Sequence, residues 1–188
     1  MKRIVLLASG SGSNVENIAN YFKDNPLVTI TCVLTNKRDA KVIDRCNRLN
    51  ISSLCFNRKA FSKSDCLLDI IKGMQPDLII LAGFLLKIPQ KFVDAFPNKI
   101  VNIHPALLPN YGGKGMYGMH VHNAVKNNNE SKTGITIHYV NENYDEGAII
   151  YQAETAVNSN DSVDDIAKKV HMLEYEHFPK VIDQLLSK

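Results

Sequence analysis

A strand-to-helix unit near the start of the chain decides the fold, and it reads RIVLLASGSGSN over residues 3–14. Its first part, Arg3–Ala8, is a short aliphatic run that is typical of a buried strand. The glycine-rich part, Ser9–Asn14, leads into Asn14–Lys23, where apolar side chains recur at the spacing of a helix. The unit therefore predicts a strand, a tight loop and a helix in succession, which is the repeating element of an α/β sheet.

The same alternation of strand and helix patterns continues along the rest of the chain. The predicted elements are strands at 29–35, 53–55, 78–82 and 100–104, helices at 40–49, 63–74 and 120–126, a helix that Pro89 begins, a hairpin of 135–140 with 148–155, and a final helix capped by Ser162. Such alternation implies parallel strands joined by right-handed crossovers. We therefore predict a Rossmann-like α/β fold: a mostly parallel sheet with helices on both faces and a C-terminal antiparallel hairpin at the sheet edge. The most apolar strand, 78–82, is expected at the centre.

Length and composition favour one ordinary globular domain over residues 1–188. Apolar residues make up 45% of the chain and charged residues 22%, which are globular values. The 22 lysines and arginines against 19 aspartates and glutamates leave a formal charge of +3. That charge is too small to argue for nucleic acid or a membrane surface as a partner. We expect neither, and we expect a monomer or a homodimer.

Short apolar runs argue against export and against membrane insertion. The run that follows Lys2 and Arg3 ends at Ala8, which is shorter than a secretory signal needs, and Leu78–Leu86 is far shorter than a membrane span. The four cysteines contain no Cys-x-x-Cys pair, so we expect free thiols rather than disulfides. These features predict a cytoplasmic protein.

The glycine loop Ser9–Asn14 is a candidate phosphate site, because glycines allow a close backbone approach and a helix N-terminus offers free N–H groups. Two features argue against a dinucleotide loop: Val15 occupies the third glycine position, and the second strand ends in Thr35-Asn36-Lys37 without an acidic residue. A P-loop is excluded because no Gly-Lys-Ser/Thr follows. The loop therefore suits a single phosphate, such as a sugar phosphate. The alternative is a plain turn that Ser13 or Asn14 caps.

Asn102 and His104 lie two residues apart at the end of a strand and point to the same side, while Ile103 points to the other. An amide can donate to an oxyanion and an imidazole can move a proton, so the pair suits acyl transfer. The alternative is a satisfied buried histidine beside a turn asparagine. Asp145 either serves a turn or brings its carboxylate to His104. His138 either reaches the same cleft or faces solvent.

Six histidines raise the question of a metal. His120 and His122, together with His104 and His138, supply enough imidazoles for zinc, but no cysteine joins them and their spacing matches no common zinc arrangement. We therefore expect no metal. Serine hydrolase chemistry is not expected either, because the sequence has no Gly-x-Ser-x-Gly elbow.

Four motifs, in the order found here, resemble those of the folate-dependent formyltransferase family. They are Ser9–Asn14 (SGSGSN), Leu81–Phe84 (LAGF), Asn102–Pro109 (NIHPALLP), and Gly134–Val140 (GITIHYV) followed by Asp145-Glu146-Gly147. The resemblance spans nearly the whole chain. It implies an enzyme that transfers the formyl group of 10-formyltetrahydrofolate to the amine of N1-(5-phosphoribosyl)glycinamide in purine biosynthesis, without a metal.

The resemblance also implies roles for individual residues. Asn102 would stabilise the tetrahedral oxyanion, His104 would donate or shuttle a proton, and Asp145 would raise the basicity of His104 or position a water. The residues implied to hold the substrate are Gly12, Ser13 and Asn14 at its phosphate and Glu174 near its ribose. Those implied to hold the pterin of the formyl-folate are Leu85, Leu86, Lys87, Ile88 and Asn102, with the pterin under the loop of Asp145.

Two stretches depart from the family pattern. The family often has Met-Arg-Ile-Leu after Ala-Gly-Phe, where this chain has Leu85–Ile88. If the pterin is held mainly by backbone the change is tolerable, and if the arginine matters the folate affinity is lower. The glycine-rich stretch Tyr111–Gly118 is longer than the family's loop at this place. It is either a mobile lid or a tolerated insertion.

Three alternatives share part of this pattern. Methionyl-tRNA formyltransferases add a C-terminal β-barrel and formyltetrahydrofolate hydrolases add an N-terminal domain, and we expect neither addition here. The third alternative, a sugar-phosphate-binding module without catalysis, does not need the combination of Asn102, His104 and Asp145. The function predicted is therefore formyl transfer to a small molecule.

Overall fold

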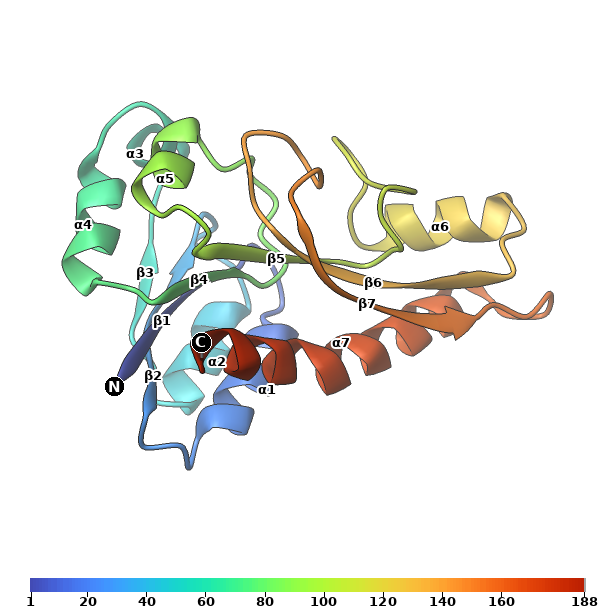
Figure 1. Cartoon of the computed structure of the whole chain (residues 1–188), viewed down its shortest axis with the longest axis horizontal. Coiled ribbons are helices and arrows are strands. Elements are labelled where there is room, and N and C mark those ends of the chain that lie inside the picture. Colours follow the sequence, from blue (N-terminus) through green and yellow to red (C-terminus); the bar gives the residue numbers. More distant parts are fainter. Residues whose placement is uncertain (188) are drawn as a thin grey trace.

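Seven strands form one sheet in the order β3-β2-β1-β4-β5-β6-β7 in the computed structural model, which describes residues 1–187 (Figure 1). The strands are β1 (Lys2–Leu7), β2 (Val28–Thr35), β3 (Ser53–Cys55), β4 (Leu78–Leu81), β5 (Ile100–His104), β6 (Lys132–Tyr139) and β7 (Ile149–Ala156). Strands β1 to β5 pair in parallel, whereas β6 is antiparallel to both β5 and β7. The mostly parallel sheet, its central β4 and its antiparallel edge hairpin are confirmed.

Helices cover both faces of the sheet, as predicted. They are α1 (Ser13–Phe22), α2 (Val42–Arg48), α3 (Arg58–Ser62), α4 (Cys66–Met74), α5 (Gln90–Ala95), α6 (Met119–Asn127) and α7 (Val163–Leu186). Figure 1 shows α1, α2 and α7 on one side of the sheet and α3, α4 and α5 on the other. Within residues 1–187, no helix is both long and apolar enough to cross a membrane.

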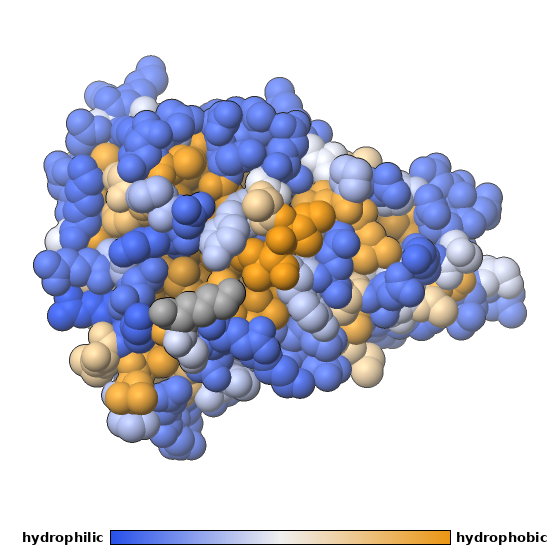
Figure 2. Space-filling model, in the orientation of Figure 1, coloured by the Kyte–Doolittle hydropathy of each residue, from blue (hydrophilic) through white to orange (hydrophobic). Residues whose placement is uncertain are grey.

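Alternate residues of the strands supply two separate cores, because neighbouring side chains of a strand point to opposite faces. On the side of α1, α2 and α7, Leu6, Ile80 and Val101 are buried with Val15 and Phe178. Burial of this apolar surface is the main driving force for closing the helices onto the sheet. Hydrophilic side chains cover most of the face drawn in Figure 2, and hydrophobic side chains gather near its middle.

The second core lies on the side of α3, α4 and α5. There Leu7 and Ile79 of the sheet pack with the rings of Phe61, Phe84 and Phe92. The ring centroids of Phe61 lie 5.5 Å from those of Phe84 and 5.1 Å from those of Phe92, which are ordinary aromatic contact distances. This core anchors the segment after β4, which forms one wall of the site described below.

The start of α7 agrees with the prediction from the sequence, whereas the helix predicted before β4 differs in the structure. Ser162 caps the start of α7 as predicted, and with Asp165 it forms a capping box in which each side chain bonds to the other's backbone. The single helix predicted at 63–74 is wrong in its first part: the structure has α3 ending at Ser62 and α4 beginning at Cys66. The side chain of Asn57 accepts from the backbone of Ala60 and so starts a short helix of its own.

Candidate active site

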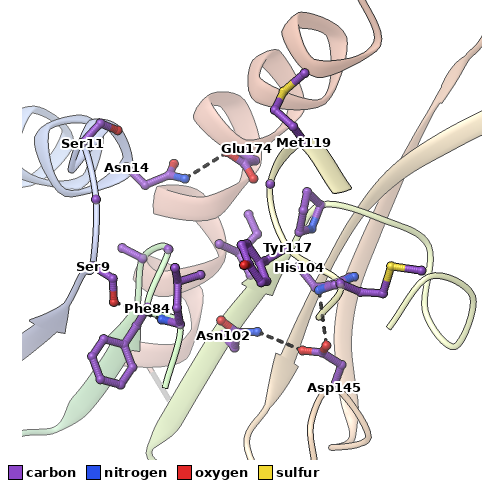
Figure 3. A pocket seen from close by; sticks show the side chains of 18 of the residues that line it. Ser9, Ser11, Asn14, Phe84, Asn102, His104, Tyr117, Met119, Asp145 and Glu174 are labelled. Carbon is purple, nitrogen blue, oxygen red and sulfur yellow. Dashed lines mark hydrogen bonds and ion pairs between the residues drawn. The ribbon is translucent and has the colours of Figure 1, made fainter. Parts of the chain in front are cut away.

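A cavity of about 680 Å³ opens at the carboxyl ends of β1, β4 and β5 (Figure 3). Its walls are formed by residues 9–14, 82–85, 102–105, 113–119 and 144–145, with Lys37, His122, His171 and Glu174. Open α/β sheets bind their ligands at this end of the strands. The cavity therefore brings together the glycine loop, the polar end of β5 and the loop of Asp145, whose position the sequence left open.

The glycine loop leaves the N-terminus of α1 open towards the cavity. Gly12 has a φ of +74°, and a Cβ atom at this position would overlap the side chain of Val42 on α2, so only glycine fits. Within the residues described, no side chain caps α1, which begins at Ser13. The first backbone N–H groups of this ten-residue helix are therefore available to an anion.

Glu174, from the middle of α7, is buried in the cavity wall and binds two side chains. Its Oε2 atom accepts from Nδ2 of Asn14 at 3.0 Å and from Nδ1 of His171 at 2.9 Å. The hydrogen bond that His171 donates to Glu174 raises the pKa of His171, against the opposing effect of burial. Figure 3 shows Asn14 and Glu174 facing one another across the cavity wall. The two residues for which the family resemblance implies roles at the phosphate and the ribose are thus in direct contact.

Asn102 is held by His138, its direct neighbour on the antiparallel strand β6. Nδ1 of His138 lies 2.8 Å from the carbonyl oxygen of Tyr139, which can only accept, so Nδ1 carries the proton. Nε2 then accepts from Nδ2 of Asn102 at 3.0 Å. Burial lowers the pKa of His138, which favours this neutral form. His138 therefore does not face solvent, but it also does not line the cavity: it is buried and reaches the site only through Asn102 and Asp145.

Asp145 joins the loop after β6 to the polar end of β5. One carboxylate oxygen lies 3.5 Å from Nδ1 of His104 and accepts from the backbone N–H of Gly113 at 2.9 Å. The other oxygen lies 3.5 Å from Nδ2 of Asn102 and 3.7 Å from Nε2 of His138. The residue is in the left-handed region, with a φ of 56°. The contact between Asp145 and His104, one of two alternatives in the sequence, is the one formed (Figure 3).

His104 is only 3% exposed and has an acceptor at each ring nitrogen. Nε2 lies 2.8 Å from the carbonyl oxygen of Tyr111, and Nδ1 faces the carboxylate of Asp145. The carbonyl oxygen can only accept, so Nε2 carries a proton, and the two contacts hold the ring in one orientation at the end of β5.

The glycine-rich stretch Tyr111–Gly118 forms a wall of the cavity rather than a surface appendage. Gly113, Gly115 and Gly118 have positive φ angles, which lets this stretch turn sharply around the entrance. The hydrogen bond from Gly113 to Asp145 ties it to the catalytic candidates. Motion of this loop stays a prediction.

Only part of the stretch assigned to the pterin reaches the cavity. Leu85 lines it and is 41% exposed, which suits contact with a flat apolar ligand. Leu86 packs partly against the second core and Ile88 is buried within it. Lys87 is exposed, with its Nζ atom 5.9 Å from the centroid of the Tyr144 ring. Leu86, Lys87 and Ile88 are not among the lining residues, and their role in folate binding stays a prediction.

Sequence reasoning did not place two histidines in the wall of the cavity, His122 and His171. His122, considered there only as a possible zinc ligand, is buried beside the cavity, and burial lowers its pKa. His171 was not singled out at all. Its spacing from Glu174, one helical turn, is the only signal that the sequence offers for His171.

Metal binding was a separate question for the histidines. In residues 1–187, no group of three or more His, Cys, Asp or Glu side chains is arranged to hold a metal ion.

The fold and the site together define a class of enzyme. The sequence profile of the formyl transferase family matches residues 2–182, so the chain belongs to the formyl transferase family, whose members are enzymes. Within that family, the relatives compared below are all phosphoribosylglycinamide formyltransferases, the group that this chain belongs with.

Three of these relatives illustrate the similarity. The enzyme of Haemophilus influenzae is 36% identical over 188 residues, which cover 97% of this chain and 86% of the relative. The chloroplastic enzyme of Arabidopsis thaliana is 37% identical over 187 residues, which cover 96% of this chain but only 64% of the relative. The crystal structure of the enzyme from Streptococcus pneumoniae superposes with a TM-score of 0.86 at 32% identity, over 98% of this chain and 99% of that one.

Proposed function

We propose that this site transfers the formyl group of 10-formyltetrahydrofolate to the amine of N1-(5-phosphoribosyl)glycinamide, a step of purine biosynthesis. One observation carries the proposal: Asn102, His104 and Asp145 meet within 3.5 Å contacts in a cavity that the glycine loop also lines. The donor and the residue roles below are part of the proposal. So are a single domain over 1–188, a monomer or homodimer, and a cytoplasmic location.

The phosphoribosyl substrate lies with its phosphate at the glycine loop. Gly12, Ser13 and Asn14 surround the open N-terminus of α1, where backbone N–H groups and the helix dipole favour an anion. Glu174 is held in place by Asn14 and offers carboxylate oxygens to the ribose hydroxyls. This placement leaves the glycinamide amine directed towards the end of β5.

Asn102 stabilises the charge that develops when the amine attacks the formyl carbon. His138 holds one of the two N–H groups of its amide, so the orientation of Asn102 is set before the substrate binds. The second N–H group, whose contact with Asp145 is long at 3.5 Å, turns to the oxyanion. Donors that are fixed in advance stabilise such an intermediate most effectively.

His104 moves the proton that the reaction requires. Attack by the amine releases a proton, and departure of the N10 nitrogen of the folate requires one, so the transfer consumes no proton overall. The ring of His104 takes up the proton of the attacking amine and, as the imidazolium, donates it to the departing nitrogen as the carbon–nitrogen bond breaks. Asp145, 3.5 Å from the ring, stabilises the imidazolium before this step.

The folate pterin occupies the apolar flank formed by Leu85 and Phe84, under the loop that carries Asp145. Leu86, Lys87 and Ile88 do not line the cavity. They therefore contact the folate only through backbone atoms, or only after this loop has rearranged. Holding both substrates together in one cavity lowers the entropic cost of the reaction.

A folate absorbance assay tests the proposal. Purified protein is mixed with 10-formyltetrahydrofolate, with and without phosphoribosylglycinamide, and the loss of the formyl donor is followed. Loss that requires the amine is the expected result. Loss without the amine identifies a hydrolase instead. No loss in either mixture, from protein shown to be folded, contradicts the proposal.

A further inference from the structure

A second cavity of about 440 Å³ lies at the carboxyl ends of β2 and β3, outside the site described above. It is bounded by the segment after β2, by the end of β3 with the start of α3, and by the first half of α4. The residues that line it include Asn36, Arg38, Phe56, Asn57, Arg58 and Leu67. Its volume falls in the range of small-molecule sites, and its place in the sheet is where α/β proteins bind ligands.

Two arginines give this cavity its charge. Arg38 and Arg58 are both exposed, and within residues 1–187 neither guanidinium forms an ion pair or a side-chain hydrogen bond. No aspartate or glutamate of the described part of the chain lines the cavity. Arginine stays charged at all ordinary pH values and binds carboxylates and phosphates with paired N–H groups.

Two asparagines add hydrogen-bond donors to the cavity. Oδ1 of Asn36 accepts from the hydroxyl of Ser9 at 2.6 Å, and Oδ1 of Asn57 accepts from the backbone of Ala60 at 2.8 Å. Each oxygen thus already has one partner inside the protein, whereas the NH₂ groups remain available to a ligand. With the two guanidinium groups, donors outnumber acceptors among these four side chains, which favours an oxyanion.

The floor of the cavity is apolar. Phe56 and Leu67 are buried beneath it, and Leu54 and Ile70 border it, with Ile70 36% exposed. An inorganic ion would leave these apolar side chains in contact with water, whereas the apolar part of an organic ligand would cover them, which is favourable. The lining thus matches a molecule with a flat apolar part and a charged end.

We propose that this second cavity binds a small organic oxyanion, a carboxylate or a phosphate monoester attached to a flat apolar body, with Arg38 and Arg58 as its charge partners. The proposal does not depend on the reaction assigned to the first cavity. Ser9 connects the two cavities. Its hydroxyl donates to Asn36, which lines the second cavity, and accepts from the backbone N–H of Leu85, which lines the first, at 3.1 Å.

Calorimetric titration of the whole protein tests the proposal with three probes. Adenosine 5′-monophosphate supplies a phosphate on a flat body, benzoyl-glutamate supplies carboxylates, and adenosine is the uncharged control. Binding of either charged probe, with adenosine at least tenfold weaker and with the arginine variants described next weakening it, supports the proposal, and the stronger probe identifies the oxyanion. No saturable binding of either charged probe up to about 10 mM overturns it.

Paired variants locate the bound probe. Removing each arginine, as Arg38→Gln and Arg58→Gln, is expected to weaken binding about tenfold or more, because a hydrogen bond to a charged group is lost. Lys41→Gln with Lys59→Gln removes the same charge from exposed positions outside the cavity and should leave binding unchanged. Equal weakening in both pairs contradicts a defined site.

Cysteine alkylation gives an independent readout, because Cys55 and Cys66 line the second cavity and the first contains no cysteine. Both thiols are free and exposed, while Cys32 and Cys46 are buried. The charged probe should slow iodoacetamide labelling of Cys55 and Cys66, as read by peptide mass spectrometry. Unchanged labelling at a saturating probe concentration would show that the probe binds elsewhere.

Discussion

Nδ2 of Asn14 donates a hydrogen bond to Oε2 of Glu174 at 3.0 Å, within the protein interior and across 160 positions of sequence. The bond links the first turn of α1, where the phosphate is proposed to bind, to the carboxylate proposed for the ribose. It therefore joins two ends of one substrate site. A change in either residue is expected to act mainly on substrate binding.

Replacing Asn14 by alanine is expected to raise the KM for the phosphoribosyl substrate and to keep kcat within a few-fold of the unmodified protein. The reason is that Asn14 is proposed to hold the phosphate end of the substrate, away from the atoms that react. Steady-state kinetics with both substrates varied measure the effect. Asn17→Ala is the matched control, since Asn17 also bonds α1 to α7, through the carbonyl of Tyr175, but does not line the cavity. A lower kcat with unchanged KM for Asn14→Ala would indicate a catalytic role instead.

His104→Ala is expected to lower kcat by about 10²–10⁴-fold, the usual contribution of a general acid or base. The comparison is His120→Ala, which removes an exposed histidine that is not among the residues lining the cavity. Circular dichroism establishes that both variants are folded. Turnover by His104→Ala close to that of the unmodified protein would rule out the proposed proton transfer.

The stability of the protein should depend on pH through His122. Burial lowers its pKa below the ordinary 6.5, so the folded protein holds the neutral ring while the unfolded chain takes up a proton first. The stability from the neutral ring is present above about pH 6.5 and is lost as the pH falls towards the folded-state pKa. Melting temperatures between pH 5 and 8 should therefore fall less steeply with acid in His122→Gln than in the unmodified protein. The same slope in both would contradict the assignment, and His120→Gln serves as the exposed control.

Gly147→Ala is expected to destabilise the protein by about 1–3 kcal/mol, because the added Cβ atom would overlap the carbonyl oxygen of Tyr139 at the base of the Asp145 loop. Gly73→Ala is the opposite case. A Cβ atom there meets nothing within 4 Å, and the residue lies inside α4, so alanine should stabilise by about 0.5–1 kcal/mol. Urea unfolding measures both, and equal midpoints for the two variants would be inconsistent with the packing described.

Most of the strands were predictable because their signals are local. The aliphatic runs of β1 and β4 and the alternation in β6 can each be recognised within a few residues. The short helix α3 was missed because its start depends on the cap that Asn57 provides. The apolar residues that follow have a stronger helical period, which suggested one longer helix.

The candidate catalytic residues were also predictable, but their contacts were not. Asn102 and His104 share one side of β5 by the simple period of a strand. That His138 lies opposite Asn102 depends on the register between β5 and β6, and a shift by one residue would turn His138 to the other face. The contact of Asp145 with His104 depends further on a loop whose backbone lies in the left-handed region.

The sequence by itself determined the α/β class, the glycine loop, the polar end of β5 and the capping box of α7, because each rests on interactions among residues a few positions apart. Only the tertiary structure decided that α7 places Glu174 against Asn14 of α1, that residues 113–119 form a wall of the cavity, and that Arg38 and Arg58 line a second one. These features arise from packing between elements distant in the chain, whose geometry depends on the whole sheet and its two cores.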